Sequence, residues 1–504
     1  MSQYSKGLCF SPKPDGTYAV AGIGSCEDLE LRIPPTTPEG GLVTEIAEDA
    51  FHYQEDEFFS DEEFCFLSVT IPDSVTHIGV EAFSDCTSLT SIIIPEGVTC
   101  IDERAFENCT SLTSVSLSDS VISLGNGAFN GCTALTSVII PRGVAVIGKE
   151  GCFDSRGLQV FAGCSNLTSI EVDKNNPTYY SQDNCVITKE TKRLVIGIPT
   201  SRIPEDITSI GDYAFEDCVN LTSAVIPAGV TAIGTRAFFG CSGLTAVTIP
   251  DSVTQIGAQA FFRCTRLTSV TIPDSVTSIG NIAFCYCESL TSVTLSNSIT
   301  AIGWNTFAHC SGLTSVTIPD GTTEIGPDAF ENCTGLTSVS LPDSITAIGR
   351  HAFAMCKGLS SLTLPNGLKE IGENAFFGCS GLTAVTIPDS VTEMNCGAFW
   401  YCTGLCSVSI PNSVTCIEPT TFHSCTSLTT ICIPNSVTSI HRLAFLGCTN
   451  LTSVIIPDSV TTMGDWVFKD CPNLTIYCAH PQCPDGWDED WNVSDCPVVW
   501  NYKG

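Results

Sequence analysis

The sequence predicts a solenoid, in which one short structural unit is stacked many times, and three observations support this prediction. A leucine returns every 23 positions, as at Leu89, Leu112 and Leu135, and the same spacing continues from Leu221 to Leu474. Most units carry the same order of residue types: two apolar segments separated by a proline and closed by a glycine. The chain has 504 residues, more than one domain usually has, but a solenoid grows without a closed core.

The first half of a unit predicts a strand followed by a turn. In residues 267–289, LTSVTIPDSVTSIGNIAFCYCES, Val270 and Ile272 alternate with polar residues, which indicates a strand with one buried face. Pro273 ends this strand because it has no N–H for a ladder. The Asp-Ser pair that follows suits a turn, since short polar side chains bond to nearby backbone.

The second half predicts a second extended segment, a corner and a helical turn. Residues 276–279 read as the second short strand, and Gly280 is expected to supply a positive φ at the corner. The spacing of Ala283, Phe284 and Cys287 predicts a short helical turn that faces inward. The free energy gained by burying the apolar side chains of one turn only about balances the conformational entropy lost when its chain becomes ordered. The turns must therefore stack on one another, and the two ends of the stack need caps.

The motif LTSVTIPDSVTSIG-x-x-AF-x-x-C resembles the BspA-like, or Treponema pallidum type, leucine-rich repeats over roughly residues 42–473. The resemblance implies a leucine-rich-repeat solenoid: a right-handed, curved single array of 23-residue turns, whose parallel β-sheet lines one face. It also implies a role in binding, since family members occur as surface adhesins of bacteria and as large protein families in some protists.

Three parts are predicted along the chain. Residues 1–41 do not fit the period and are expected to form an N-terminal β cap. Residues 42–473 form the array, and residues 474–504 form a C-terminal cap that contains three tryptophans and three cysteines. A sugar-stacking site is the alternative interpretation of this tail, and a zinc site from its cysteines with His480 is a weaker one.

Insertions interrupt the array and are the places where a partner is expected first. An acidic insertion, residues 52–64, surrounds Phe58 and Phe59 and reads as a solvated loop, a docking loop for a basic partner or a calcium site. A second insertion lies at 152–160. An island at 175–199 predicts a β-hairpin, with strands near 184–188 and 194–198 around a turn at 189–193. Its candidate partner-binding residues are Tyr179, Tyr180, Lys192 and Arg193.

Two further irregularities lie inside regular turns. Aromatic residues stand beside the repeated Phe, and they predict either partial packing between turns or a contact patch: Phe239, Phe262, Phe377 and Trp400. The corner glycine is replaced in three successive units by Asn395, Glu418 and His441, which indicates either drift or a surface in use.

Seventeen of the thirty cysteines share one position of the repeat, which predicts a column of buried thiols. Disulfides between neighbouring turns require Cα atoms within about 7 Å. No CxxC pair stands with His or Cys partners at ligand spacing, so we expect no metal. The column is Cys65, Cys86, Cys109, Cys132, Cys164, Cys218, Cys241, Cys264, Cys287, Cys310, Cys333, Cys356, Cys379, Cys402, Cys425, Cys448 and Cys471.

Charge and hydropathy exclude some partners. The net charge of −33 predicts repulsion from nucleic acid and anionic membranes. The sequence contains no run of 18 apolar residues, which is the length that a transmembrane helix needs, so we expect no membrane insertion. The first residues lack an apolar signal core, which predicts a cytoplasmic protein. A cell-surface or secreted location is the alternative, if the start is truncated or export is unconventional.

The sequence predicts a non-enzymatic, protein-binding scaffold without a cofactor, and a monomer is favoured. The seven histidines do not suggest a triad, and the glycines belong to the repeat. A surface adhesin that binds host or matrix protein, or glycan, is the alternative. Binding to ice or another regular surface is a remote alternative. It rests on a hydroxyl-rich strand face: Ser269, Thr271, Ser292, Thr294, Ser315, Thr317, Ser338, Ser340, Ser361 and Thr363.

Overall fold

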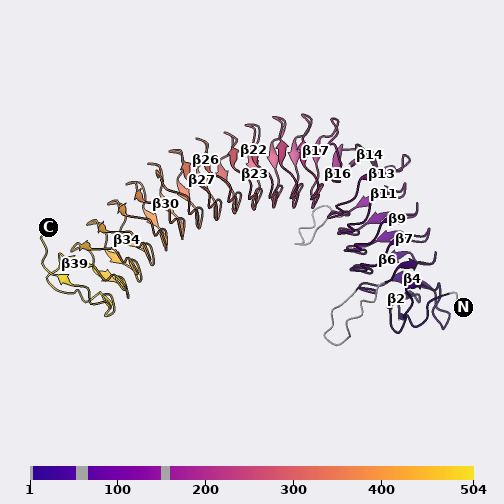
Figure 1. Ribbon diagram of the computed structural model, residues 1–504, viewed down its shortest axis with the longest axis horizontal. Coiled ribbons are helices and arrows are strands. Elements are labelled where there is room, and N and C mark those ends of the chain that lie inside the picture. Colours follow the sequence, from indigo (N-terminus) through magenta and orange to yellow (C-terminus); the bar gives the residue numbers. More distant parts are fainter. Residues whose placement is uncertain (1–3, 53–65, 149–158, 504) are drawn as a thin grey trace. The chain divides into compact units, whose positions relative to one another are not determined.

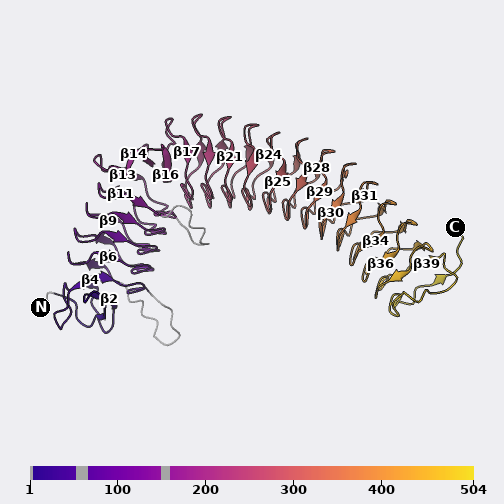
Figure 2. The same cartoon turned by 180° about the vertical axis from the view of Figure 1, so that it is seen from behind.

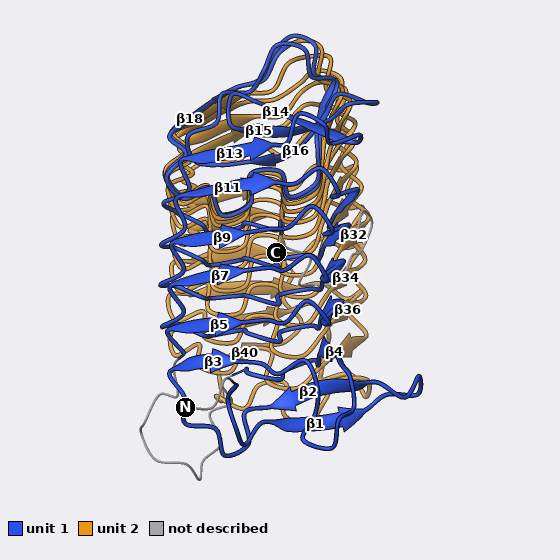
Figure 3. Cartoon of the chain, turned by 90° about the vertical axis from the view of Figure 1, so that its right-hand side faces the viewer, with its two compact units in different colours: residues 1–250 blue, residues 251–504 orange. Residues whose placement is uncertain are grey.

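The computed structural model describes residues 4–52, 66–148 and 159–503, in two compact units, residues 1–250 and 251–504 (Figure 3). Each unit is a stack of turns of about 23 residues, and strands of neighbouring turns run parallel. Figure 1 and Figure 2 show these turns from opposite sides. Most turns contribute one strand to a first row and a shorter strand to a second row, although in the turn of residues 359–381 the first row has only an isolated bridge between Ser338 and Ser361. Each unit is therefore a parallel β-solenoid, as the sequence predicted.

The first row holds the strands that begin each turn. In the first unit its strands are β3 (Glu30–Arg32), β5 (Ser68–Thr70), β7 (Ser91–Ile93), β9 (Ser114–Ser116), β11 (Ser137–Ile140), β13 (Ser169–Val172), β18 (Ser223–Val225) and β20 (Ala246–Thr248). In the second unit they are β22 (Ser269–Thr271), β24 (Ser292–Thr294), β26 (Ser315–Thr317), β28 (Ser338–Ser340), β31 (Ala384–Thr386), β33 (Ser407–Ser409), β35 (Thr430–Cys432), β37 (Ser453–Ile456) and β39 (Thr475–Cys478).

The second row holds the strands that precede the corner of each turn. In the first unit they are β4 (Val43–Ile46), β6 (His77–Ile78), β8 (Cys100–Ile101), β10 (Ser123–Leu124), β12 (Val146–Ile147), β17 (Ser209–Ile210) and β19 (Ala232–Ile233). In the second unit they are β21 (Gln255–Ile256), β23 (Ser278–Ile279), β25 (Ala301–Ile302), β27 (Glu324–Ile325), β29 (Ala347–Ile348), β30 (Glu370–Ile371), β32 (Glu393–Met394), β34 (Cys416–Ile417), β36 (Ser439–Ile440) and β38 (Thr462–Met463).

Register within the first row follows the repeat. Ser269 of β22 pairs with Ser292 of β24, 23 residues later, so residues at the same position of the repeat lie next to each other in neighbouring turns. Val270 points into the core, whereas the hydroxyl residues on either side of it are exposed. The predicted hydroxyl face is therefore a solvent-facing ladder of Ser and Thr. The turn after β22 closes where the N–H of Val276 donates to the carbonyl of Pro273.

The predicted helical turn is wrong, because no helix occurs in the described ranges. Ile282 and Tyr286, two residues before and after Phe284, have φ of 64° and 61°. The N–H groups of Ile282, Phe284 and Tyr286 donate to carbonyls of the next turn, at 2.8–2.9 Å, instead of to their own segment. A left-handed backbone conformation costs roughly 1–2 kcal/mol for each L-residue, and the hydrogen bonds between turns offset this cost.

The predicted role of the corner glycine also needs correction. Gly280 does not have a positive φ. A Cβ at this position would lie 2.3 Å from the backbone nitrogen of Ala258, in the corner of the preceding turn. Glycine is required at most corners because two backbones approach closely there.

Threonine supports the stack at two repeated positions. The hydroxyl and the N–H of Thr291 both donate to the carbonyl of Thr268, one turn earlier, at 3.1 and 2.9 Å. Thr323 bonds to Thr300 in the same way after the turn between the two strands. The frequent threonines of the repeat therefore carry inter-turn hydrogen bonds.

The core of each unit is built from columns of identical side chains. In the second unit Phe284 stacks on Phe307, with ring centroids 5.5 Å apart and an angle of 5° between the planes. The cysteines of the predicted column that lie in the described residues are all buried. The side chains that vary between turns are therefore mostly on the surface.

The ends of the chain differ from the regular turns. β1 (Cys9–Pro12) pairs antiparallel with β2 (Tyr18–Gly22), and β2 runs parallel to β4. At the other end β40 (Val498–Val499) pairs with β39, and Trp491 packs edge-on against Phe468, the last ring of its stack. Trp487 is also buried, and its indole N–H donates to Val460. Both tryptophans are thus packing residues rather than an open sugar platform.

In the three ranges that the structure describes, no helix has the length and apolar character that crossing a bilayer requires.

Candidate functional site

The regular stacking of the first unit changes at the island. Three strands form an antiparallel meander there: β14 (Tyr179–Gln182), β15 (Cys185–Thr188) and β16 (Arg193–Gly197). The sequence predicted the second and third of these strands but not the first. Asp183 and Asn184, with φ of 50° and 62°, form the two-residue turn between β14 and β15. An Asp-Asn pair tolerates such values better than most residues, so this turn had a signal in the sequence.

The meander rejoins the second row, while the first row is interrupted. β16 runs parallel to β17, which resumes the regular order. In the first row no strand is assigned to residues 198–206, between β13 and β18. Pro199 lacks an N–H, and the N–H of Arg202 donates to Asp183 in the meander turn instead of to a neighbouring strand. The gap in the first row therefore follows from local sequence.

Two small residues leave open volume at the place where the first-row strand is missing. From Val69 to Val454 the middle residue of the first-row segment is Val, Ile or Leu, except in two consecutive turns, which carry Ser201 and Ala224. The Ser201 hydroxyl accepts a hydrogen bond from the N–H of Ile198, at 2.8 Å. Because both residues lack the branched side chain of the other turns, volume is left open here.

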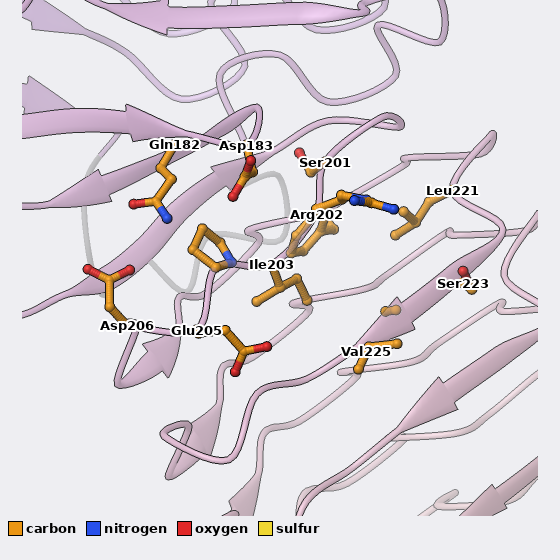
Figure 4. Close-up of a pocket in the computed structure, with 13 residues that line it drawn as sticks. Gln182, Asp183, Ser201, Arg202, Ile203, Glu205, Asp206, Leu221, Ser223 and Val225 are labelled. Carbon is orange, nitrogen blue, oxygen red and sulfur yellow. The ribbon is translucent and has the colours of Figure 1, made fainter.

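A pocket of about 750 Å³ occupies this place (Figure 4). Ile203 lies between the meander turn, marked by Asp183, and the exposed Val225 of β18 (Figure 4). The pocket contains apolar surface beside charged groups. It is lined by Gln182, Asp183, Ser201, Arg202, Ile203, Pro204, Glu205, Asp206, Phe215, Leu221, Ser223, Ala224 and Val225.

The charge at the pocket is predominantly negative. Asp183, Glu205 and Asp206 are exposed carboxylates, and Arg202 is the one basic residue among the lining side chains. Val225 is 68% exposed and adds apolar surface to the pocket lining. The site thus offers an apolar contact with an acidic surround.

Of the four island residues predicted to contact a partner, Tyr180 and Lys192 come together beside the pocket. The Lys192 ammonium donates to the Tyr180 hydroxyl at 3.1 Å and to Asp206 at 3.3 Å, and it lies 4.4 Å from the Tyr180 ring centre. The hydrogen bond to Tyr180, then that to Asp206, raises the pKa of Lys192. Asp206 therefore links this cluster to the pocket rim.

The other two island residues lie elsewhere. Tyr179 is only 7% exposed and its hydroxyl faces the carbonyl of Ala145, so it belongs to the core. Arg193 pairs with Asp212 of the next turn at 3.1 Å. Tyr179 therefore does not belong to the exposed surface of the island that a partner could contact.

A buried contact between Glu216 and Arg236 supports the turn that carries Phe215 of the pocket. The Glu216 carboxylate is fully buried, accepts a hydrogen bond from the N–H of Gln159 at 3.0 Å, and faces Arg236 at 2.9 Å. Burial raises the pKa of Glu216 to about 8, although Arg236 opposes the shift. The Gln159 amide also donates to the carbonyls of Gly197 and Ala214. These bonds join the turn before the island to the turn after it.

The aromatic residues predicted beside the Phe stack are half-buried and packed against neighbours. The Arg236 guanidinium lies 3.9 Å from the ring centre of Phe239. Phe262 meets Tyr286 edge-on at 5.6 Å, and Phe377 lies 5.0 Å from Trp400. Their common arrangement is packing between turns, with one edge left at the surface. Phe58 and Phe59 lie outside the described residues.

One of the replaced corners, Asn395, lines a shallow depression of about 320 Å³ in the second unit, together with Cys396, Glu370, Glu373, Gly372 and Arg350. Asn395 donates its side-chain N–H to Glu370 at 3.2 Å. The N–H groups of Asn395 and His441 keep the hydrogen bond to the preceding turn that the corner glycines make. The replacements at Asn395 and His441 therefore keep the hydrogen bond between turns.

The stacked parallel strands and the repeated 23-residue leucine motif define a leucine-rich-repeat solenoid. The profile of the BspA type leucine-rich repeat region matches residues 52–176, 208–337 and 346–475. Since these segments make up more than half of the chain, the protein belongs to the BspA-type leucine-rich-repeat family. Leucine-rich-repeat solenoids typically serve as protein-interaction scaffolds.

Solved structures of bacterial leucine-rich-repeat proteins are similar to this chain. A protein from Bacteroides ovatus has 21% identity and a TM-score of 0.48, with 98% of each chain covered. A leucine-rich cell surface protein from Faecalibacterium prausnitzii has 23% identity and a TM-score of 0.37, covering 100% of this chain and 99% of its own. The leucine-rich-repeat protein of T. pallidum has 21% identity and a TM-score of 0.28, covering 53% and 91%. No curated protein matches the chain.

Proposed function

We propose that the protein is a non-catalytic scaffold that binds a protein partner at the pocket in the first row. The observation that carries this proposal is the coincidence of three irregularities in one place. The first row lacks a strand there, two consecutive turns lack their branched core residue, and an extra meander stands alongside. In a chain whose other turns are nearly uniform, a surface that departs from the repeat offers the information that specific recognition needs.

The chemistry of the pocket favours one kind of partner. An exposed Val225 and the half-buried Ile203 offer contact to an apolar side chain. Asp183 and Glu205 make no ion pair within the described residues, so they are available to a basic group of the partner. We expect the partner to present an apolar residue flanked by Lys or Arg.

The regular Ser and Thr ladder suits this role less well. Its outward residues repeat with little change from turn to turn, as in β22, β24 and β26. Such a surface offers many equivalent hydrogen-bonding groups but few features that distinguish one protein from another.

A random-sequence peptide library tests the proposal. The 504-residue protein is the bait, and enriched peptides are expected to combine an apolar side chain with flanking basic residues. The double variant Ser201→Val, Ala224→Val fills the pocket with the residues that other turns carry, so it should fold and lose the peptides. Ser292→Val adds similar apolar bulk to the exposed face of the first row in a regular turn and should retain them. Equal binding by both variants would contradict the proposal.

We also propose that the protein works in a reducing compartment, as a cytoplasmic location requires. The sulfurs of the cysteine column lie within hydrogen-bond distance of backbone carbonyls, for example Cys333 of Phe307 and Cys356 of Phe330, and only a reduced thiol can donate such a bond. Neighbouring turns lie about 4.8 Å apart, within the Cα separation that a disulfide spans. Oxidation would therefore be expected in an oxidising compartment.

A further inference from the structure

A pair of residues recurs at two corners that are far apart in the sequence. β8 begins with Cys100 and is followed by Asp102 at the corner, and β34 begins with Cys416 and is followed by Glu418. Among the second-row strands of the described residues, no other begins with Cys, and no other is followed by an acidic corner residue. Cysteine and carboxylate thus occur together at both places.

Each pair is joined by a histidine from an adjacent turn. His77 of β6 stands in register with Cys100, on the preceding turn. His441 follows β36, on the turn after Cys416 and Glu418. In both clusters the thiol sulfur, one carboxylate oxygen and one imidazole nitrogen all lie within 4.8 Å of one another. All six side chains are half-buried, so solvent reaches both clusters.

The first cluster is held together by short contacts. The Cys100 sulfur lies 3.1 Å from Asp102 Oδ1, and His77 Nε2 lies 2.7 Å from Asp102 Oδ2. The Ser123 hydroxyl, in register on the next strand, lies 3.2 Å from the Cys100 sulfur. The second cluster places the same kinds of group together: the ligand atoms of Cys416, Glu418 and His441 lie within 4.8 Å of one another, and Ser439 of the next strand stands in register with Cys416.

Side chains larger than hydrogen are unusual at these corners. A Cβ on Gly125 would lie 2.5 Å from the peptide of Asp102, and one on Gly464 would lie 2.5 Å from the nitrogen of Arg442. Most turns therefore carry glycine. Two separate replacements by an acid, each beside a cysteine and a histidine, break the local rule in the same way, which is typical of functional positions.

We propose that each cluster binds one divalent transition-metal ion of the zinc class, held by Cys100, Asp102 and His77 in the first unit and by Cys416, Glu418 and His441 in the second. Thiolate, imidazole and carboxylate are the side chains that bind Zn²⁺. With bonds of roughly 2.3 Å to sulfur and 2.0–2.2 Å to nitrogen and oxygen, tetrahedral ligands lie roughly 3.2–3.6 Å apart. The observed separations need only small side-chain rotations to reach this geometry.

The proposal differs from the expectation of no metal that the sequence suggested. That expectation considered ligands close together in sequence, whereas these come from adjacent turns, with 23 residues between His77 and Cys100 and between Glu418 and His441. Three protein ligands leave one position for water or for a side chain of another protein. An ion at each site would join two neighbouring turns.

The test uses the 504-residue protein under reducing conditions with Zn²⁺ as the only added metal. Equilibrium dialysis at micromolar free Zn²⁺ should give two ions that depend on these clusters. Asp102→Gly and Glu418→Gly restore the corner glycine of the other turns, so they should fold, and each should lose one ion. The double variant Cys406→Ser, Cys432→Ser removes two exposed cysteines from the first row, and it should keep both ions.

Two further measurements separate metal ligation from a structural role. In the Co²⁺-loaded protein, thiolate-to-cobalt absorption should be lost in Cys100→Ser, Cys416→Ser and kept in the control. Zn²⁺ should raise the melting temperature of the wild-type protein but not of the double glycine variant. Bound zinc unchanged in that variant, or no bound zinc at all, would overturn the proposal. Loss of an ion in only one single variant would overturn the assignment of the other cluster.

Discussion

The thiol of Cys310 donates a hydrogen bond to the carbonyl oxygen of Phe284 in the preceding turn, with sulfur and oxygen 3.2 Å apart. The same relationship recurs along the second unit, from Cys287 and Phe261 to Cys471 and Phe445. Cysteine suits this position because it is small, packs as an apolar group and still carries one donor for a buried carbonyl. The repeated cysteine is therefore a structural residue of the stack.

Replacing Cys310 with Ala should lower the free energy of unfolding by about 1–3 kcal/mol, because a buried carbonyl loses its donor and a small cavity remains. Urea denaturation measures the change. Cys406→Ala, at an exposed position, should alter stability by less than about 0.5 kcal/mol. Equal midpoints for the two variants would show that the thiol hydrogen bond contributes nothing.

Thiol reactivity should change sharply on unfolding. Burial raises the pKa of most thiols in the column, for example that of Cys379 to about 12, so these thiols should react slowly in the folded protein. After denaturation without reductant, a thiol reagent should count most of the thirty cysteines. A count near zero would indicate disulfides, and would favour an exported adhesin over the reducing compartment that we propose.

Two substitutions test the corrections to the predicted backbone. One replaces a corner glycine with alanine, and the other introduces a glycine at a position with positive φ. A Cβ on Gly349 would lie 2.8 Å from the peptide between Gly326 and Pro327, so Gly349→Ala should destabilise the protein by about 1–3 kcal/mol. Leu443 has φ of 62°, at a position where another turn carries Gly397. Leu443→Gly should therefore be neutral or stabilising, by up to about 1 kcal/mol. The reverse order of stabilities in urea would contradict this account of the corner.

The comparison of sequence and structure explains why these corrections were needed. A strand that contains Val270 and ends before Pro273 follows from local patterns, as does the burial of Val270, Ile272 and Cys287, and the structure has these features, with the strand at Ser269–Thr271. The left-handed conformation of Ile282 and Tyr286 depends on hydrogen bonds to the next turn, so a β-branched residue and an aromatic residue occupy it against their own preferences.

The candidate sites show a similar division. The island was predictable because its residues leave the period. The sequence also hints at the pocket, since Ser201 and Ala224 replace branched residues. Only the structure shows that these two residues are adjacent in the stack and line one pocket. The cysteine–acid–histidine clusters combine residues from different turns, which only the register of the strands brings together.

The buried Glu216 predicts a pH dependence of stability. Its pKa is about 8 when folded, against 4.5 for the unperturbed group, so between these values the folded state holds more protons than the unfolded state. The free energy of unfolding contributed by this group should thus fall as pH rises from about 4.5 to about 8, by at most about 1.4 kcal/mol per pH unit.

The variant Glu216→Gln isolates this effect, because the amide does not titrate. The difference in urea midpoint between the variant and the wild-type protein should move in the variant's favour as pH rises across that range. Glu205→Gln, at an exposed position, is the control and should follow the wild type at every pH. Parallel curves for Glu216→Gln and wild type would refute the raised pKa.

The central claim is that the repeat builds a stack and that recognition takes place where the repeat is broken. Hydrogen–deuterium exchange, with and without a peptide selected from the library, tests this claim most directly. The account predicts that the peptide slows exchange at residues 182–183, 201–206 and 223–225, around the pocket. Slowed exchange along the Ser and Thr ladder of β22, β24 and β26, with none at the pocket, would contradict it.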